Sequence, residues 1–163
     1  IKAHGIKKAD IDYILATHYH PDHMGIIGNL QNFGIRLVIV DVQQDHIHFP
    51  DDIFAREKHI SYTPVDENNA VRISCAGSRT FLQSIGISGE IIHTPSHSND
   101  SITVILDDGD CYVGDLEPIE YLAAYSGNPA LQRDWELLMT YNPKHIYYAH
   151  VNDKIVAAMR TKA

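Results

Sequence analysis

The sequence predicts a single α/β domain built from layers of sheet and helix. An apolar run over 13–16, a segment with helical apolar spacing over 24–33 and a second apolar run over 36–40 follow one another within about 30 residues, which is the order of a β-α-β unit. The chain has 163 residues, of which 44% are hydrophobic and 21% charged, and this composition supplies one sizeable core. We therefore expect one domain over residues 1–163.

Periodicity predicts the first three elements. The run from Tyr13 to Ala16 is apolar and ends at a polar stretch, which indicates a short strand followed by a loop. Over 24–33 apolar side chains recur at helical spacing, and Gly34 ends the pattern. Four consecutive apolar residues follow Arg36, as is typical of a buried strand.

The rest of the chain is less regular. Aromatic, charged and helix-breaking residues mix over 41–69, so we predict irregular structure there with one or two short helices. A final helix over 153–159 is preceded by a helix over 134–141 and a strand over 145–148. Before them, a helix is predicted over 76–85, followed by three strands over 90–93, 101–106 and 111–113. Asp108 and Gly109 are expected to turn a hairpin between the second and third of these strands.

Composition and charge exclude several classes of protein. Thirteen Lys and Arg against 21 Asp and Glu give a formal charge of -8, which leaves no broad basic face for a nucleic acid. Apolar stretches fall far short of the roughly 18 residues of a membrane span, so we expect no membrane segment. Cys75 and Cys111 are the only cysteines and form no C-x-x-C pair, which favours a reducing compartment, and we expect a cytoplasmic protein.

The chain is rich in histidine, with 11 in 163 residues, and three of them fall in one short motif. The motif runs from Thr17 to His23, reads Thr-His-Tyr-His-Pro-Asp-His, and directly follows the first predicted strand. Alternation sends His18 and His20 to the same side of an extended chain, where both can reach one cation. Asp22 and His23 are then available for a second cation. A solvated polar loop is the alternative interpretation.

This motif resembles that of the metallo-β-lactamase superfamily, and three later segments extend the resemblance. His97, in His-Thr-Pro-Ser-His-Ser, matches the histidine that completes the family's first metal site. Asp115, in Tyr-Val-Gly-Asp-Leu, matches the carboxylate that bridges both metals. His150 follows the last predicted strand, where the family places the final histidine of its second site. The resemblance implies the family's αββα sandwich, in which mixed sheets are flanked by helices.

By this resemblance every position of a two-metal site is filled. The first metal takes His18, His20 and His97, the second takes Asp22, His23 and His150, and Asp115 is shared. Asp22 is also the candidate catalytic residue. We expect two divalent ions per chain, with zinc as the metal, while the same imidazole and carboxylate ligands suit iron and manganese.

Such a site implies a binuclear metallo-hydrolase. Two cations about 3.5–4 Å apart can share a hydroxide and polarise a carbonyl or phosphoryl oxygen. We expect this metal-bridging hydroxide to attack a small-molecule ester, lactone, thioester or similar acyl substrate. The alternatives are a phosphodiesterase of the same fold, a single-iron dioxygenase, and a truncated metal-binding remnant that is not catalytic.

Two features depart from the family pattern. Ser96 stands where the family usually has Gly, so we expect an altered loop around His97, with a shifted ligand as one outcome. Only 17 residues precede His18, so we expect the N-terminal part of the first sheet to be missing. An open sheet exposes edges and apolar faces, which predicts a homo-oligomer or a partner chain that covers the sheet.

The sequence indicates a role at the metal site less strongly for other residues. His46 and His48 repeat the H-x-H spacing without a following Asp-His pair, and the segment 45–62 around them is expected either to line a substrate cleft or to pack as core and cap. Further residues near the motifs carry two interpretations, support of the metal site or plain turn and packing roles: Asp10, Asp12, Tyr19, His93, Asn99 and Asp100.

Overall fold

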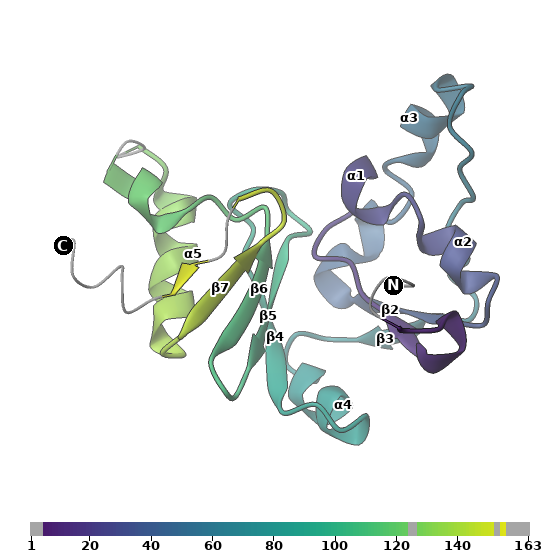
Figure 1. Ribbon diagram of the computed structural model, residues 1–163. Coiled ribbons are helices and arrows are strands. Elements are labelled where there is room, and N and C mark those ends of the chain that lie inside the picture. The colour runs from purple at the N-terminus through teal and green to yellow at the C-terminus, as the bar shows by residue number, and fades with distance from the viewer. Residues whose placement is uncertain (1–4, 124–126, 152–153, 156–163) are drawn as a thin grey trace.

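The protein folds into two β-sheets that lie side by side between helices (Figure 1). The computed structural model describes residues 5–123, 127–151 and 154–155. The elements up to the first sheet's last strand are η2 (Lys8–Asp10), β1 (Tyr13–Ile14), α1 (Pro21–Met24), α2 (Ile27–Gln31), β2 (Arg36–Val40), η3 (Asp41–His46), α3 (Asp51–Arg56) and β3 (Val71–Ile73). They are followed by α4 (Ser78–Ser84), β4 (Gly89–His93), β5 (Ile102–Leu106), β6 (Asp110–Gly114), η4 (Ile119–Ala123), α5 (Pro129–Thr140), β7 (His145–Tyr148) and β8 (Lys154–Ile155).

The first sheet has the order β1-β2-β3 and its pairs are parallel. Side chains alternate along β2, and Leu37 and Ile39 point to the outer face of the sheet. There they pack with Met24 of α1 and Ile27 of α2 in a buried cluster. The short helices after the histidine motif therefore cover this face.

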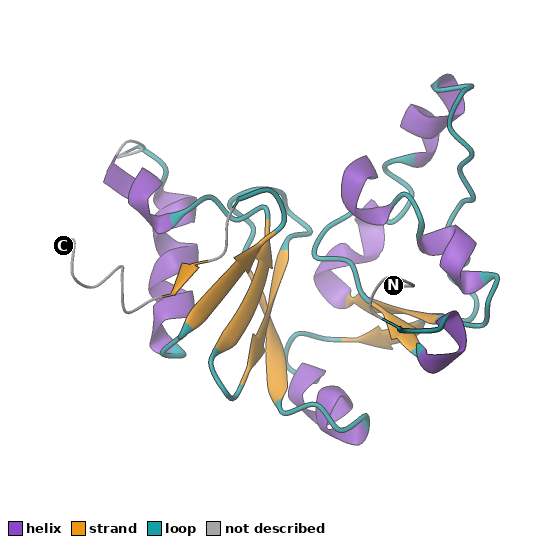
Figure 2. Ribbon diagram, in the orientation of Figure 1, coloured by secondary structure: helices purple, strands orange, loops and turns teal. Residues whose placement is uncertain are grey.

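The second sheet has the order β4-β5-β6-β7-β8 and is mixed, because β6 and β7 run parallel while the other pairs are antiparallel. Its outer face packs against α5, where Trp135 and Leu138 join Val113 of β6 and Ile146 of β7 in the largest buried cluster. Figure 2 shows α5 lying along this sheet on the side away from the first sheet.

A third cluster fills the space between the sheets. Val40 of β2 packs with Ile91 of β4 and Ile102 of β5, and Leu82 of α4 closes the cluster at one side. The layers thus run helix, sheet, sheet, helix, and the α/β prediction with mixed sheets flanked by helices is confirmed.

Several element boundaries differ from the predictions. The helix expected over 24–33 begins earlier and divides into α1 and α2 around Gly25 and Ile26. Helix α5 starts at Pro129 rather than at 134, because the Asn128 side chain accepts a hydrogen bond from Leu131 N and caps it. Strand β3 forms after the segment 41–69 and before the helix predicted from 76, where no element was predicted. The predicted helix over 153–159 falls largely outside the described residues, and the two that are described form β8.

The first sheet has three described strands against five in the second. Tyr112 of β6 is exposed on the face opposite α5, since its neighbours Cys111 and Val113 point toward that helix. Association with a second chain over this face stays a prediction that light scattering can test. Among the described residues, no helix is long and apolar enough to cross a membrane.

Candidate metal centre

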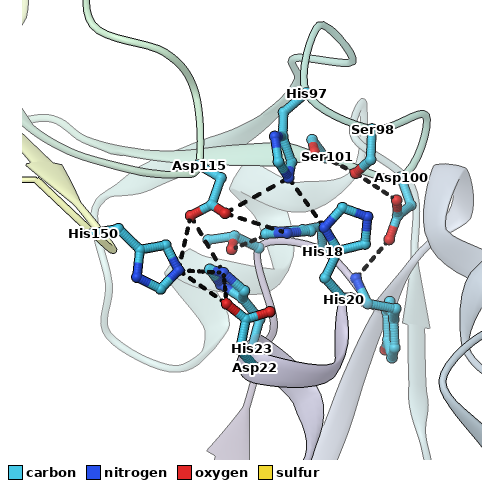
Figure 3. Close-up of polar contacts among 12 residues, drawn as sticks. His18, His20, Asp22, His23, His97, Ser98, Asp100, Ser101, Asp115 and His150 are labelled. Atoms are coloured by element: carbon cyan, nitrogen blue, oxygen red, sulfur yellow. Dashed lines mark hydrogen bonds and ion pairs between the residues drawn. The ribbon is translucent and has the colours of Figure 1, made fainter. Parts of the chain in front are cut away.

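The seven residues predicted as metal ligands lie together at one edge of the two sheets (Figure 3). Each follows the carboxyl end of a strand or opens the short helix after it. The loop after β1 carries the first two histidines, α1 carries an Asp-His pair, and the loops after β4, β6 and β7 supply one residue each: His18, His20, Asp22, His23, His97, Asp115 and His150. The strand pattern that the sequence predicts therefore brings distant residues to one place.

Local sequence explains how the loops approach so closely. Gly114 has a φ of +59°, and a Cβ there would lie 2.5 Å from Thr17 Oγ1. Only glycine allows this contact between the ends of β6 and β1. Thr17 Oγ1 in turn lies 3.3 Å from His18 Nδ1, so it contacts the ring nitrogen that faces away from Asp115. Thr17 had no assigned role in the sequence, because Gly114, which it approaches closely, comes from another strand.

His18, His20 and His97 form the first group, here called the first metal position. Their potential ligand atoms lie within 4.8 Å of one another. His97 Nε2 is 3.1 Å from His20 Nδ1, and the His18 ring meets both other rings edge to face. His18 is fully buried. Burial and the neighbouring His23, His20 and His97 lower the pKa of His18 to about 4, so its imidazole is neutral at pH 7.

Asp22, His23, Asp115 and His150 form the second group, here called the second metal position. Their potential ligand atoms also lie within 4.8 Å of one another. His150 Nε2 is 3.0 Å from Asp22 Oδ2 and 3.2 Å from His23 Nε2. This group is open to solvent on one side, since the side chains of Asp22 and His150 are each 59% exposed.

Asp115 lies between the two positions and presents one carboxylate oxygen to each. Its Oδ2 is 3.6 Å from His97 Nε2 and 3.9 Å from His18 Nε2. Its Oδ1 is 3.2 Å from His23 Nε2 and 3.5 Å from His150 Nε2. This is the arrangement expected of a carboxylate shared by two cations.

The residues fit a pair of metal ions. His18 Nε2 and Asp115 Oδ1 are buried and have no hydrogen-bond partner among the described residues, a costly condition that a cation would relieve. Ligand atoms about 2.0–2.1 Å from one zinc lie about 3.3 Å apart in a tetrahedron. The imidazole nitrogen pairs at 3.1 and 3.2 Å match that spacing. Neutral imidazole, the form that binds metal, is favoured at both His18 and His97, because burial lowers the pKa of His97 as well.

Comparison with known families decides which group of proteins this geometry belongs to. The profile of the metallo-beta-lactamase superfamily matches residues 1–150. The chain belongs to the metallo-beta-lactamase superfamily. The resemblance inferred from the motifs is thereby confirmed.

Individual relatives agree with this membership. Beta-lactamase-like protein 2 homolog of Drosophila melanogaster is 25% identical over 146 residues, which are 90% of this chain and 47% of that protein. The chain thus spans about half the length of this curated relative. Two solved structures, TTHA1623 in a di-iron-bound form and BLEG-1 B3 metallo-beta-lactamase, are each 18% identical, with TM-scores of 0.68 and 0.67. Each match covers 91% of this chain and 74% of the other, and shows the metallo-beta-lactamase fold.

The substitution of Ser96 for the family's glycine leaves His97 within the first metal position. Ser96 N donates a 2.7 Å hydrogen bond to Asp134 Oδ2 of α5, which holds the loop. Ser96 does not adopt a positive φ, which among the described non-glycine residues only Asn142 does. The serine therefore needs no positive φ here, and His97 lies beside His18 and His20.

Most of the residues with two interpretations have turn or packing contacts. Asp12 is exposed just before β1, and its backbone carbonyl accepts a 2.9 Å hydrogen bond from Arg36 N. His93 Nε2 lies 2.8 Å from Asn99 O, so the His93 ring joins the two ends of the loop 93–99 rather than a predicted metal ligand. Asp10 accepts a hydrogen bond from Lys7 N in a turn. Tyr19 packs in the buried cluster beneath α1 and α2. His48 lies 2.8 Å from carboxylate oxygens of both Asp51 and Glu67, apart from the metal centre.

A small pocket opens beside the first metal position. It has a volume of about 80 Å³ and is lined by Tyr19, His20, His46, Phe49, Ser98, Asn99 and Asp100. The Phe49 ring is 56% exposed and lies 6.1 Å from the His20 ring, centre to centre. Part of the segment 45–62 therefore lines a pocket at the site, which agrees with one of its two interpretations.

Proposed function

We propose that this chain is a binuclear metallo-hydrolase that cleaves a small ester, lactone, thioester or similar acyl substrate. The observation that carries the proposal is the position of Asp115, whose two oxygens face two separate groups of histidines. Membership of the metallo-beta-lactamase superfamily supports a metal-dependent hydrolase. A pair of divalent cations held here would activate water as a nucleophile and polarise the substrate's carbonyl oxygen.

The protein's own residues have distinct roles in this proposal. His18, His20 and His97 would hold one cation, Asp22, His23 and His150 would hold the other, and Asp115, which faces both groups, would be shared. Asp22 is the candidate catalytic residue, because its carboxylate lies at the open side and its Oδ2 is 3.0 Å from His150 Nε2. There the carboxylate could accept a proton from the attacking water.

The pocket beside His20 supports a small acyl group. At about 80 Å³ the pocket is small beside the roughly 300–1,000 Å³ of a typical ligand site, so it suits a small group. The rings of Phe49 and His46 line it, and Asn99 adds an amide. We infer that short acyl chains fit here better than long ones.

Zinc is the metal we propose, with iron as the alternative. The histidine and carboxylate donors accept both. The related TTHA1623 structure is in a di-iron-bound form, and iron is therefore the alternative metal for this chain. We also propose a cytoplasmic location, supported by the free thiols of Cys75 and Cys111.

Turnover assays on metal-loaded protein test the proposal. Protein loaded separately with zinc, iron or manganese is offered acetyl, butyryl and hexanoyl aryl esters, a lactone, a thioester and a bis-aryl phosphodiester. We expect hydrolysis of the acyl substrates, fastest with short chains, and loss of at least about 100-fold in rate for Asp22→Ala. Asp12→Ala, at the opposite end of β1, is the matched control and should keep full activity.

Each other outcome has a defined meaning. Cleavage of the phosphodiester alone replaces the acyl hydrolase with a phosphodiesterase. Two bound metals with no turnover of any substrate contradict the proposed activity and favour a metal-binding domain without catalysis. Oxygen consumption by the iron form alone would identify a dioxygenase.

A further inference from the structure

A buried carboxylate outside the predicted ligand set lies behind the first metal position. Asp100 is 3% exposed. Its Oδ2 accepts a 2.6 Å hydrogen bond from Tyr19 N, and its Oδ1 accepts a 2.8 Å hydrogen bond from Ser98 Oγ. Tyr19 stands between His18 and His20, and Ser98 follows His97. One carboxylate thus joins the two loops that carry all three histidines (Figure 3).

Gln43 holds the same junction from the side of η3. It is fully buried, and its Nε2 donates hydrogen bonds to Ala16 O at 3.0 Å and Asp100 O at 3.2 Å. Ala16 is two residues before His18, so Gln43 fixes the chain just before the motif while Asp100 fixes it inside the motif. Buried amides and carboxylates with satisfied partners make such a junction rigid.

We propose that Asp100, braced by Gln43, is a positioning residue that sets the spacing of His18, His20 and His97 for the first metal. The inference rests on the proposed metal site. The 3.1 Å between His97 Nε2 and His20 Nδ1 depends on how the two loops lie relative to each other, and Asp100 bonds to both loops. Its described hydrogen bonds reach the motif at Tyr19 N and the His97 loop at Ser98, whereas Asp22 and His23 of the second metal position lie further along the motif on α1, and His150 follows β7.

This separation predicts a selective effect. Asp100→Ala leaves the buried Tyr19 N–H without its acceptor and frees the His97 loop, so the first metal position loses its spacing. Asp100→Asn keeps one oxygen for Tyr19 N–H and offers its amide to Ser98 Oγ, so it should restore most of the geometry. Gln43→Leu keeps the volume but removes the donors to Ala16 O and Asp100 O, and should act in the same direction as Asp100→Ala.

Zinc titration of the full chain tests the proposal. Calorimetry and competition with a chelator give the affinity of each of the two binding steps, and ¹⁵N NMR of labelled histidine rings reports which rings hold metal. For Asp100→Ala we expect one step to weaken by about 10-fold or more, the usual cost of losing a residue that orients a ligand. The ring signals of His18, His20 and His97 should lose their zinc-bound shifts, while those of His23 and His150 keep them.

Ser78→Ala is the control for general destabilisation. Ser78 is fully buried and ties α4 to β4 through Ile91 N at 2.9 Å and Cys75 O at 2.7 Å, away from the histidines. It should lower the melting temperature without changing either zinc affinity. Unchanged zinc binding in Asp100→Ala, or equal weakening in Asp100→Asn and Asp100→Ala, would overturn the positioning role. A wild type that binds no zinc at either position would instead overturn the proposed metal site itself.

Discussion

The two metal positions differ in how firmly the protein holds them. In the first, His18 is fully buried and its loop is tied down by Thr17, Gln43 and Asp100. In the second, Asp22 and His150 are each 59% exposed. The first set thus has one buried, braced ligand beside the part-buried His20 and the exposed His97, whereas the second set has no fully buried ligand and is more open to water. The difference suggests a division of work in which the first position anchors a metal and the second, more open position exchanges water.

The largest expected effect comes from Asp115, the one residue that both positions share. Asp115→Ala removes the carboxylate between them and leaves the histidines without a common neighbour. We expect both zinc affinities to fall by about 10-fold or more and the hydrolytic rate to become undetectable. Elemental analysis and a rate assay check this. Retention of two tightly bound metals by this variant would remove Asp115 from the ligand set.

A pair of histidine variants tests the comparison directly. His18→Ala opens the buried, braced position, and water cannot easily replace a ligand there, so we expect that metal to be lost. His150→Ala acts at the exposed position, where water can take the vacated place, so we expect only about 10-fold weaker binding of one metal. Metal content after dialysis distinguishes the two variants. Equal losses would show that burial does not separate the two positions.

The metal-free protein should lose stability in acid because of His18. Burial and the neighbouring histidines lower the pKa of His18 from 6.5 to about 4. Between these values the unfolded chain binds a proton that the folded chain does not, so the free energy of unfolding falls as the pH drops from 6.5 to 4, by up to about 3 kcal/mol. Urea unfolding at several pH values measures this. The slope should be shallower in His18→Asn, and an unchanged slope would contradict the assignment.

His48 should show the opposite dependence and the smallest effect. Burial lowers the pKa of His48, but hydrogen bonds to Glu67 and Asp51 raise it more. The ion pairs therefore stabilise the fold at pH below about 6.5 and are lost as the pH rises through the raised pKa. The pairs are solvent-exposed, so His48→Gln should cost less than about 1 kcal/mol at pH 6 and nothing at high pH. A loss that persists at high pH would mean that packing, not charge, explains the effect.

Sequence reasoning predicted much of the sheet framework and named the seven residues that the structure brings together in two groups. Strands β2 and β7 have the predicted bounds, because continuous or alternating apolar runs indicate buried strands. The dense histidine motif after the first strand indicated His18, His20, Asp22 and His23 as candidate ligands, and the resemblance to the family added His97, Asp115 and His150. Each motif sits at a strand end, so the sheet order alone brings it to the centre.

The residues that hold the centre in place were harder to predict. Gln43 and Asp100 lie 57 residues apart, and the bond between them depends on how η3 and the loop before β5 meet. Nothing in the local sequence distinguishes a buried glutamine from an exposed one. Likewise the early start of α5 depends on the Asn128 cap, and β3 is too short at three residues to give a clear periodic pattern.

Anomalous X-ray diffraction from crystals grown with saturating zinc tests the central claim most directly. The account predicts two peaks about 3.5–4 Å apart, one on each side of Asp115. One peak should be bounded by His18, His20 and His97, and the other by Asp22, His23 and His150. A single peak, or two peaks that do not share Asp115, would contradict the binuclear centre.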